Sequence, residues 1–279
     1  EIRIVSLTVT EGGYYMNTTS KDFNIDHPDI KKDIENPTSP RTVFGVMVEA
    51  LRLRRQLGYG PVTGLCCDNL EKNGVVLHRA VTKLAEQIDP DLAEWISENC
   101  SFPCSMVDCI VPSTGAYELE LVQAYSLNDN VPVTHENFRQ WVIEDDFCAG
   151  RPDLEKVGVI FTKKVHYYET MKIRLLNGGH QIIANVGELL SLVTISDCMQ
   201  DTRIASLFVK ILSEEIAPHV DSVPNKTPAE YIELIQKRFS NPTVVDTTRR
   251  VAFDGSSRHP GFLVPSINKA VETGSSISG

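Results

Sequence analysis

The first part of the chain alternates between strand-like and helix-like segments, and this order restricts the fold more than any other feature. Residues 2–10 and 62–67 have the alternating or continuous apolar character of strands, with many β-branched side chains. Helical patterns begin near Ser39 and at Asn73. Strand, helix, strand, helix is typical of a parallel sheet covered by helices. We therefore expect an α/β domain.

Polar residues stand where these two strands end. Thr10-Glu11 stands at the end of the first strand, and Asp68-Asn69 stands at the end of the second. Parallel α/β sheets bind their ligands at the carboxyl ends of the strands. These residues are therefore candidates for ligand binding.

The pattern changes after about residue 165. Long segments with helical apolar periodicity run through 169–194, 203–216 and 228–239, with few strand signals. We expect residues 1–165 to form the α/β domain and residues 166–279 to form a mainly α-helical domain.

The helical half opens with a run that carries three polar groups of catalytic type. On an α-helix, Asn177 lies roughly 140° and His180 roughly 80° around the axis from Lys172. A buried lysine can act as a base, an amide can donate to an oxyanion, and an imidazole can bind a hydroxyl. This set suits oxidation of an alcohol without a metal. Alternatively, the charges are solvated and Asn177 simply ends a helix.

Composition excludes several classes of partner. A formal net charge of -10 over 279 residues argues against nucleic acid. No window is apolar over the ~18 residues that span a bilayer, and no signal-peptide pattern occurs. Seven cysteines, an odd number, fit reduced thiols in the cytoplasm. We expect a cytoplasmic monomer or small homo-oligomer that binds a small molecule, with no membrane or nucleic-acid partner.

Other catalytic motifs do not fit their surroundings. Gly58-Tyr59-Gly60 precedes a strand, so it is no phosphate-binding turn. Tyr168 and Lys172 match the Tyr-x-x-x-Lys dyad of short-chain dehydrogenases, but they begin a helical half. The histidines have no zinc-binding spacing, and no Gly-x-Ser-x-Gly elbow is present. We therefore expect no metal.

Several sequence blocks together resemble one family, and they occur in the family's order along nearly the whole chain. The blocks are Thr8–Tyr14, Cys67–Leu70 with Asn73-Gly74, Ser101–Pro103, Ser105–Asp108, Glu144-Asp145 with Phe147, Gly150–Pro152, Met171-Lys172, Leu175–Gly178 with His180, Arg238–Asn241 and Asp254–Arg258. They resemble the polyol-specific long-chain dehydrogenase/reductases, the family of mannitol dehydrogenase and fructuronate reductase.

The resemblance implies a Rossmann-type NAD-binding domain followed by a helical substrate-binding domain, with no zinc. It also implies that the chain is a fragment, with the glycine-rich phosphate loop upstream of Glu1 and more helical sequence after Gly279. The cofactor is expected to be NAD, with NADP not excluded, because the ribose-reading residue would lie upstream. Thr10, Glu11 and Gly12 are the expected cofactor contacts.

The resemblance also assigns catalytic roles. Lys172 corresponds to the catalytic lysine, and Asn69 and Asn177 correspond to the asparagines that hold the oxyanion. His180 matches the histidine beside the substrate, and Glu169 matches a carboxylate that controls proton exit.

Three further positions are implied to line the polyol site: Asp108, Arg250 and Arg258. Relatives often carry Lys at the last position. The chain departs from its relatives at Cys104 and Cys109, which flank Asp108 and replace Asn and Arg.

The implied reaction is oxidation of a secondary alcohol of a polyol to a ketose, with D-mannitol and D-fructose as the first expectation. Fructuronate reductase and arabinitol dehydrogenase activities are alternatives within the family. A truncated, inactive chain without the phosphate loop is an alternative of another class.

Overall fold

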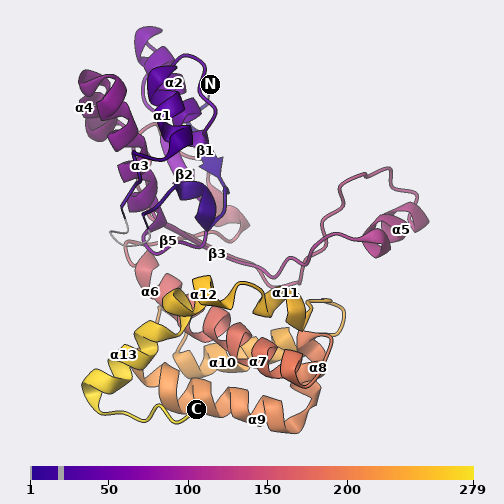
Figure 1. The fold of residues 1–279 in the computed structure, drawn as a ribbon. Helices are drawn as coiled ribbons and strands as arrows, with labels where there is room; N and C mark the ends of the chain where they lie inside the picture. Colours follow the sequence, from indigo (N-terminus) through magenta and orange to yellow (C-terminus); the bar gives the residue numbers. More distant parts are fainter. Residues whose placement is uncertain (1, 18–21) are drawn as a thin grey trace. The chain divides into compact units, whose positions relative to one another are not determined.

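The structure is a computed structural model that describes residues 2–17 and 22–279, without the side chain of Glu11. It divides into two compact units (Figure 1). The first unit comprises Glu1–Val107 and Gln140–His166, and the second comprises Asp108–Arg139 and Tyr167–Gly279. The predicted boundary at 165/166 stays a prediction; the structure groups residues 108–139 with the helical unit.

The first unit is an α/β structure with parallel strands, as expected. Strand β1 pairs in parallel with β2, from Ile4 opposite Thr63 to Leu7 opposite Cys66, and β4 pairs in parallel with β5. The elements are β1 (Ile4–Leu7), η1 (Glu11–Tyr14), α1 (Pro28–Glu35), α2 (Val43–Gln56), β2 (Thr63–Cys66), α3 (Asn73–Ile88), α4 (Pro90–Asn99), β3 (Ser105–Asp108), β4 (Gln140–Ile143), η2 (Leu154–Val157) and β5 (Ile160–Phe161).

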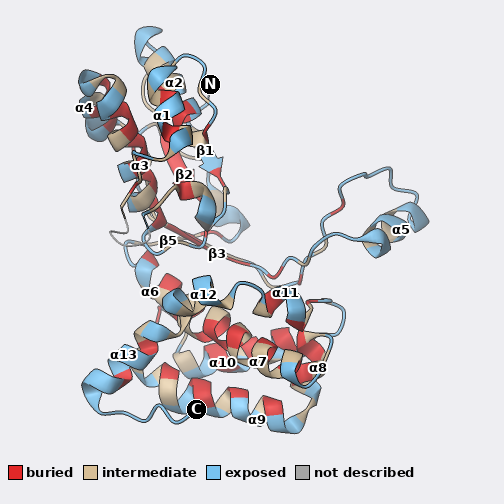
Figure 2. Ribbon diagram, viewed as in Figure 1, coloured by how far each residue is buried: buried red, intermediate tan, exposed pale blue. Residues whose placement is uncertain are grey.

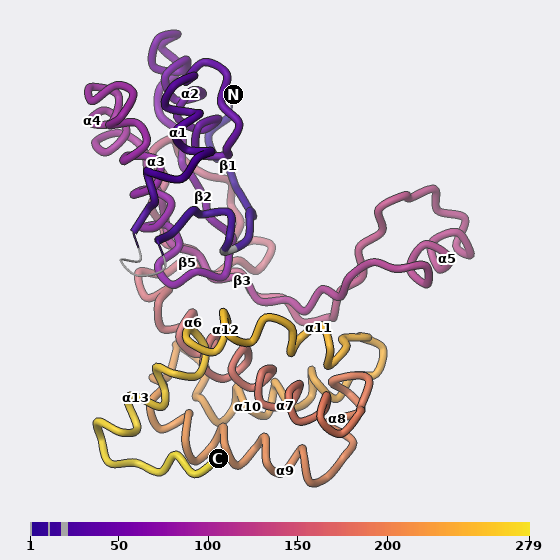
Figure 3. Tube along the Cα trace, in the orientation of Figure 1, coloured from indigo at the N-terminus to yellow at the C-terminus, as the bar shows by residue number. Residues whose placement is uncertain are grey.

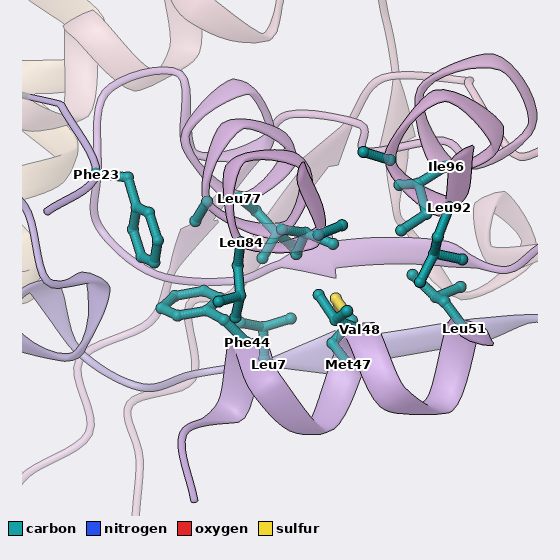
Figure 4. Close-up of a cluster of buried hydrophobic side chains, with 14 of the residues drawn as sticks. Leu7, Phe23, Phe44, Met47, Val48, Leu51, Leu77, Leu84, Leu92 and Ile96 are labelled. Atoms are coloured by element: carbon teal, nitrogen blue, oxygen red, sulfur yellow. The ribbon is translucent and has the colours of Figure 1, made fainter. Parts of the chain in front are cut away.

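Apolar faces of the helices form the core of this unit (Figure 4). Helix α3 buries Leu77 and Leu84 at helical spacing, and α2 buries Phe44 opposite them. Leu7 of β1 and Ile96 of α4 belong to the same cluster. Burial of these side chains supplies the main driving force for packing the helices on the strands.

One asparagine joins the end of β2 to the start of β3. The Nδ2 group of Asn73 donates to the carbonyl oxygens of Cys66, Asp68 and Ser105, the last at 2.8 Å. Its Oδ1 accepts from the backbone N–H of Ser105 at 2.9 Å. The side chain is buried, so each of these bonds satisfies a group that water does not reach. Asn73 therefore fixes the carboxyl edge of the first unit.

The second unit is mainly helical, as expected. Its elements are α5 (Ala116–Ala124), α6 (Val165–Met171), η3 (Lys172–Asn177), α7 (Gly178–Leu189), α8 (Ile195–Gln200), α9 (Thr202–Ile211), η4 (Leu212–Ile216), η5 (Ala217–His219), α10 (Pro228–Phe239), α11 (Thr248–Ala252), α12 (Gly255–Phe262) and α13 (Val264–Thr273).

Helix α7 is the central element of this unit and is largely buried, whereas α5 buries no side chain (Figure 2). Two glycines of α7 allow close packing: a Cβ at Gly179 would collide with Phe208, and one at Gly187 would collide with Thr248. The last residues of the chain return toward η4, where the N–H of Gly279 donates to Glu215 (Figure 3).

Replacing Asn73 by Ala is expected to lower the free energy of unfolding by about 3 kcal/mol, because it leaves buried backbone groups without partners. The matched control is Asn99→Ala, since Asn99 is exposed and its amide donates only to Trp95 within its own helix. Urea unfolding of both variants checks this. Equal losses in the two variants would contradict the role given to Asn73.

Candidate active site

The segment that carries Lys172, Asn177 and His180 is helical but not a regular α-helix. Residues Lys172–Asn177 form a π-helix between α6 and α7, in which the N–H of Gly178 donates to the carbonyl of Ile173. The angles expected for an α-helix are therefore wrong. A π-turn bonds residues five apart, so Lys172 and Asn177 lie on adjacent turns of one side. Short π-segments of this kind occur often at functional sites.

Two of these side chains are set into the interior of the helical unit. Lys172 is only 7 % exposed, and the Oδ1 atom of Asn177 is buried. Among the described residues, this Oδ1 has no hydrogen-bond partner. A buried amide that lacks a partner is costly, unless a ligand supplies one.

His180 lies on α7 with its ring stacked on Phe239, at a centroid distance of 3.9 Å and an interplanar angle of 5°. Its Nε2 atom is buried and has no hydrogen-bond partner among the described residues. Burial, followed by the nearby positive charges of Arg250, Arg238, Arg258 and Lys172, lowers the pKa of His180 to about 3. The imidazole is therefore neutral at physiological pH.

The cations around His180 differ in how they are compensated. Arg250 is paired with the buried carboxylate of Asp246, at 2.6 Å from Nη2 to Oδ2. Arg258 donates from Nη1 to the carbonyl of Val251 at 2.9 Å, and within residues 2–17 and 22–279 it forms no ion pair. The region is thus electropositive, and Arg258 retains donors for a further acceptor.

Asp108 is buried in an ion-pair network. Its carboxylate accepts two hydrogen bonds from Arg238, at 2.7 and 2.9 Å, and one from the hydroxyl of Tyr231, at 2.9 Å. Arg238 also donates to Glu136, at 2.7 and 3.0 Å. Burial, followed by Asp108, raises the pKa of the Tyr231 hydroxyl, so it remains a donor.

In the first unit, Asp68 holds the backbone that follows β1. Its carboxylate accepts from the N–H groups of Val9 and Thr10, at 3.0 and 2.9 Å, and from the hydroxyl of Tyr14, at 2.6 Å. Thr10 has φ 61° and ψ 164°, a conformation that is essentially confined to glycine. Backbone strain of this kind persists only when neighbouring bonds enforce it. Asp68 supplies those bonds.

The other predicted residues of the first unit lie beside this turn. Asn69 is exposed and follows Asp68 directly, and a Cβ at Gly12 would meet no atom within 4 Å. The side chain of Glu11 is not described. The strand ends therefore present an open backbone turn, which fits a nicotinamide cofactor approaching the carboxyl edge of parallel strands.

Glu169 lies on α6 and is 7 % exposed.

The structure brings Lys172, His180, Arg250 and Arg258 into one region of the helical unit. Asn69, Thr10 and Gly12 belong to the first unit, and Asp108 joins the helical region through Arg238.

Other classes of site find no support in the described residues. No group of three or more His, Cys, Asp or Glu side chains among them could hold a metal ion. Within the same residues, no helix is long and apolar enough to cross a membrane. All seven cysteines are free thiols, and burial raises the pKa of the Cys66 thiol to about 11.

No functional role was predicted from the sequence for Arg238, Glu136 or Tyr231. A signal was present for the first: Tyr231, Ile235 and Arg238 follow the helical spacing of the apolar face of α10. A charged residue on a buried helix face is rarely tolerated unless it is paired. No comparable signal marks Glu136, which lies in a polar loop.

Family models cover nearly the whole chain. Residues 1–156 match the mannitol dehydrogenase Rossmann domain, and residues 164–279 match the mannitol dehydrogenase C-terminal domain.

Individual relatives agree with these matches. The chain is 52 % identical to mannitol 2-dehydrogenase of Cereibacter sphaeroides, over 98 % of this chain and 57 % of that protein. It is 42 % identical to D-mannonate oxidoreductase of Escherichia coli, over 98 % of this chain and 56 % of that protein.

Among solved structures, the chain is similar to mannitol 2-dehydrogenase of Pseudomonas fluorescens in its ternary complex with NAD and D-mannitol. The TM-score is 0.92 at 40 % identity, over 99 % of this chain and 56 % of that one. The chain thus spans little more than half the length of the relatives it matches. Two consecutive family models, matched by an α/β unit and a helical unit, place this chain in the mannitol dehydrogenase family.

Proposed function

We propose that the protein to which this chain belongs oxidises a secondary alcohol of a polyol to a ketose, with a nicotinamide cofactor and without a metal. The observation that carries the proposal is the polar cluster on the π-helix and α7. There, a buried lysine, a buried amide with an unpartnered oxygen and a neutral imidazole occupy one short segment of a mannitol dehydrogenase family member.

When bound, the nicotinamide cofactor accepts the hydride from the carbinol carbon. Thr10, Glu11 and Gly12 would hold it, at the turn that Asp68 fixes. We take NAD as the cofactor because the similar ternary complex contains it. NADP is the alternative.

Lys172 accepts the proton of the hydroxyl group that is oxidised. Burial disfavours the charged form of an amine, which prepares Lys172 to act as a base. Asn69 and Asn177 donate hydrogen bonds to the oxygen as negative charge develops on it. Glu169, one turn before Lys172 on α6, passes the proton toward solvent.

His180 stays neutral throughout the working pH range, so it offers a hydrogen bond to a hydroxyl group without adding a charge. Asp108, Arg250 and Arg258 bind the remaining hydroxyl groups. D-Mannitol, oxidised to D-fructose, is the substrate we propose, because the relative at 52 % identity is a mannitol 2-dehydrogenase.

A sugar acid, as in fructuronate reduction, is the second candidate. Arg258, which forms no ion pair within the described residues, can donate two hydrogen bonds to a carboxylate. The D-mannonate oxidoreductase at 42 % identity favours the same alternative. Arabinitol remains a third substrate to test.

Replacing Lys172 by Ala in the full-length protein is expected to lower turnover by about 10³-fold or more, because the base is lost. Turnover is measured with mannitol, sorbitol, arabinitol and mannonate, each with NAD and NADP. Lys210→Ala, an exposed lysine on α9, is the matched control and should leave turnover unchanged. A loss below about tenfold for Lys172→Ala would rule out the base. A wild-type protein inactive on all four substrates would overturn the proposed function.

The stability of the protein should depend on pH through His180. Between its ordinary pKa of about 6.5 and about 3, the unfolded chain binds a proton there and the folded chain does not. The free energy of unfolding therefore falls as pH falls through this window. His180→Asn removes this contribution, so the stability lost between pH 7.5 and pH 5 should be about 2 kcal/mol smaller in the variant than in the wild type, as measured by urea unfolding. The same pH dependence in both proteins would show that His180 titrates normally.

A further inference from the structure

We propose that Arg238 is the positioning residue of the polyol site. Its guanidinium, shared with Glu136, holds the carboxylate of Asp108 in the orientation in which one oxygen accepts a hydrogen bond from a substrate hydroxyl. This inference rests on the proposed polyol dehydrogenase function, in which Asp108 contacts the substrate.

The planar guanidinium of Arg238 donates hydrogen bonds to two carboxylates at once. Nη2 and Nη1 donate to the two oxygens of Asp108, at 2.7 and 2.9 Å, which fixes the plane of the carboxylate. Nε and Nη2 face the two oxygens of Glu136, at 3.0 and 2.7 Å. The three side chains are each 4 % exposed or less. A lysine carries its three N–H donors on one nitrogen, so it cannot span two carboxylates with paired hydrogen bonds in this way.

One hydrogen-bond acceptor site of the Asp108 carboxylate receives no donor from the described residues. A carboxylate has about four acceptor sites. Arg238 takes one on each oxygen, and the hydroxyl of Tyr231 takes the second on Oδ2. Within residues 2–17 and 22–279, the acceptor site that remains is on Oδ1. It accepts a hydroxyl donor such as a polyol provides, and a carbonyl oxygen cannot occupy it.

Glu136 fixes the backbone next to Asp108. Its Oε1 accepts from the N–H of Ile110 at 2.7 Å, and its own N–H donates to the carbonyl of Ile110 at 3.1 Å. The ring of Phe138 lies under Arg238, with the guanidinium carbon 4.2 Å from its centroid. Both ends of the segment 108–139 are thus attached to the last turn of α10.

The same turn of α10 orients a second predicted substrate contact. Phe239, which follows Arg238 in sequence, stacks on the ring of His180. A buried ion-pair network contributes little net stability, because the desolvation of its charges offsets their attraction. The network instead fixes the positions of Asp108 and His180, which an apolar core would not do.

The test compares Arg238→Lys, Asp108→Asn and the double variant in the full-length protein. Arg238→Lys should raise the KM for the polyol by about tenfold or more, with the KM for the cofactor unchanged. The double variant should be no worse than Asp108→Asn alone, because Arg238 acts through Asp108. Arg249→Lys is the matched control, since Arg249 is exposed and its pair with Glu188 lies on the surface. It should change neither constant.

The outcomes distinguish a failure of the role given to Arg238 from a failure of the proposed polyol dehydrogenase function. A polyol KM within about twofold of wild type in Arg238→Lys, while Asp108→Asn raises it, would make Arg238 a structural residue only. If the effects of the two single substitutions on the polyol KM simply add in the double variant, Arg238 would likewise be a structural residue only. Should Arg238→Lys fail to fold, Glu136→Gln replaces it: a polyol KM raised about threefold supports the proposal, and an unchanged one contradicts it. A wild-type protein that neither binds nor oxidises polyols would overturn the proposed function and this role together.

Discussion

One guanidinium, that of Arg238, compensates two buried carboxylates in the helical unit, and the arrangement of the proposed substrate site depends on it. Without Arg238, Asp108 and Glu136 would be two negative charges held out of water at high cost. With it, the segment 108–139 is fastened to α10, although that segment lies between two strands of the other unit in sequence. These ion pairs thus fix Asp108 and Glu136 against α10 within the helical unit.

In the first unit, a single carboxylate fixes the backbone in a similar way. Asp68 accepts hydrogen bonds from two consecutive backbone N–H groups and a tyrosine hydroxyl, and so holds Thr10 in a strained conformation. Asn73 holds the other side of the same edge. Asp68 and Asn73 thus form their hydrogen bonds within the first unit, whereas Asn177 and His180 in the helical unit keep buried atoms that no described residue satisfies.

Much of the fold was predictable because it follows from local periodicity. The parallel pair β1 and β2, helices α3 and α10 and the mainly helical second half agree with the patterns read from the sequence. The π-helix at Lys172–Asn177 was not predictable in this way, because apolar spacing does not distinguish one inserted residue in a long helix. The network of Arg238 and Glu136 joins residues about a hundred positions apart, and such pairs leave no local pattern. The catalytic roles came from the resemblance to the family and remain proposals.

The central claim is that the Lys172 amine removes the hydroxyl proton. Its most direct test is the rate of mannitol oxidation by full-length Lys172→Ala as a function of added ethylamine. If the lost amine is the base, a small free amine should enter the space and restore turnover in proportion to its concentration, and only when the amine is unprotonated. A rate that stays at the level of the variant at every ethylamine concentration and pH, in a protein that still binds mannitol, would contradict the claim.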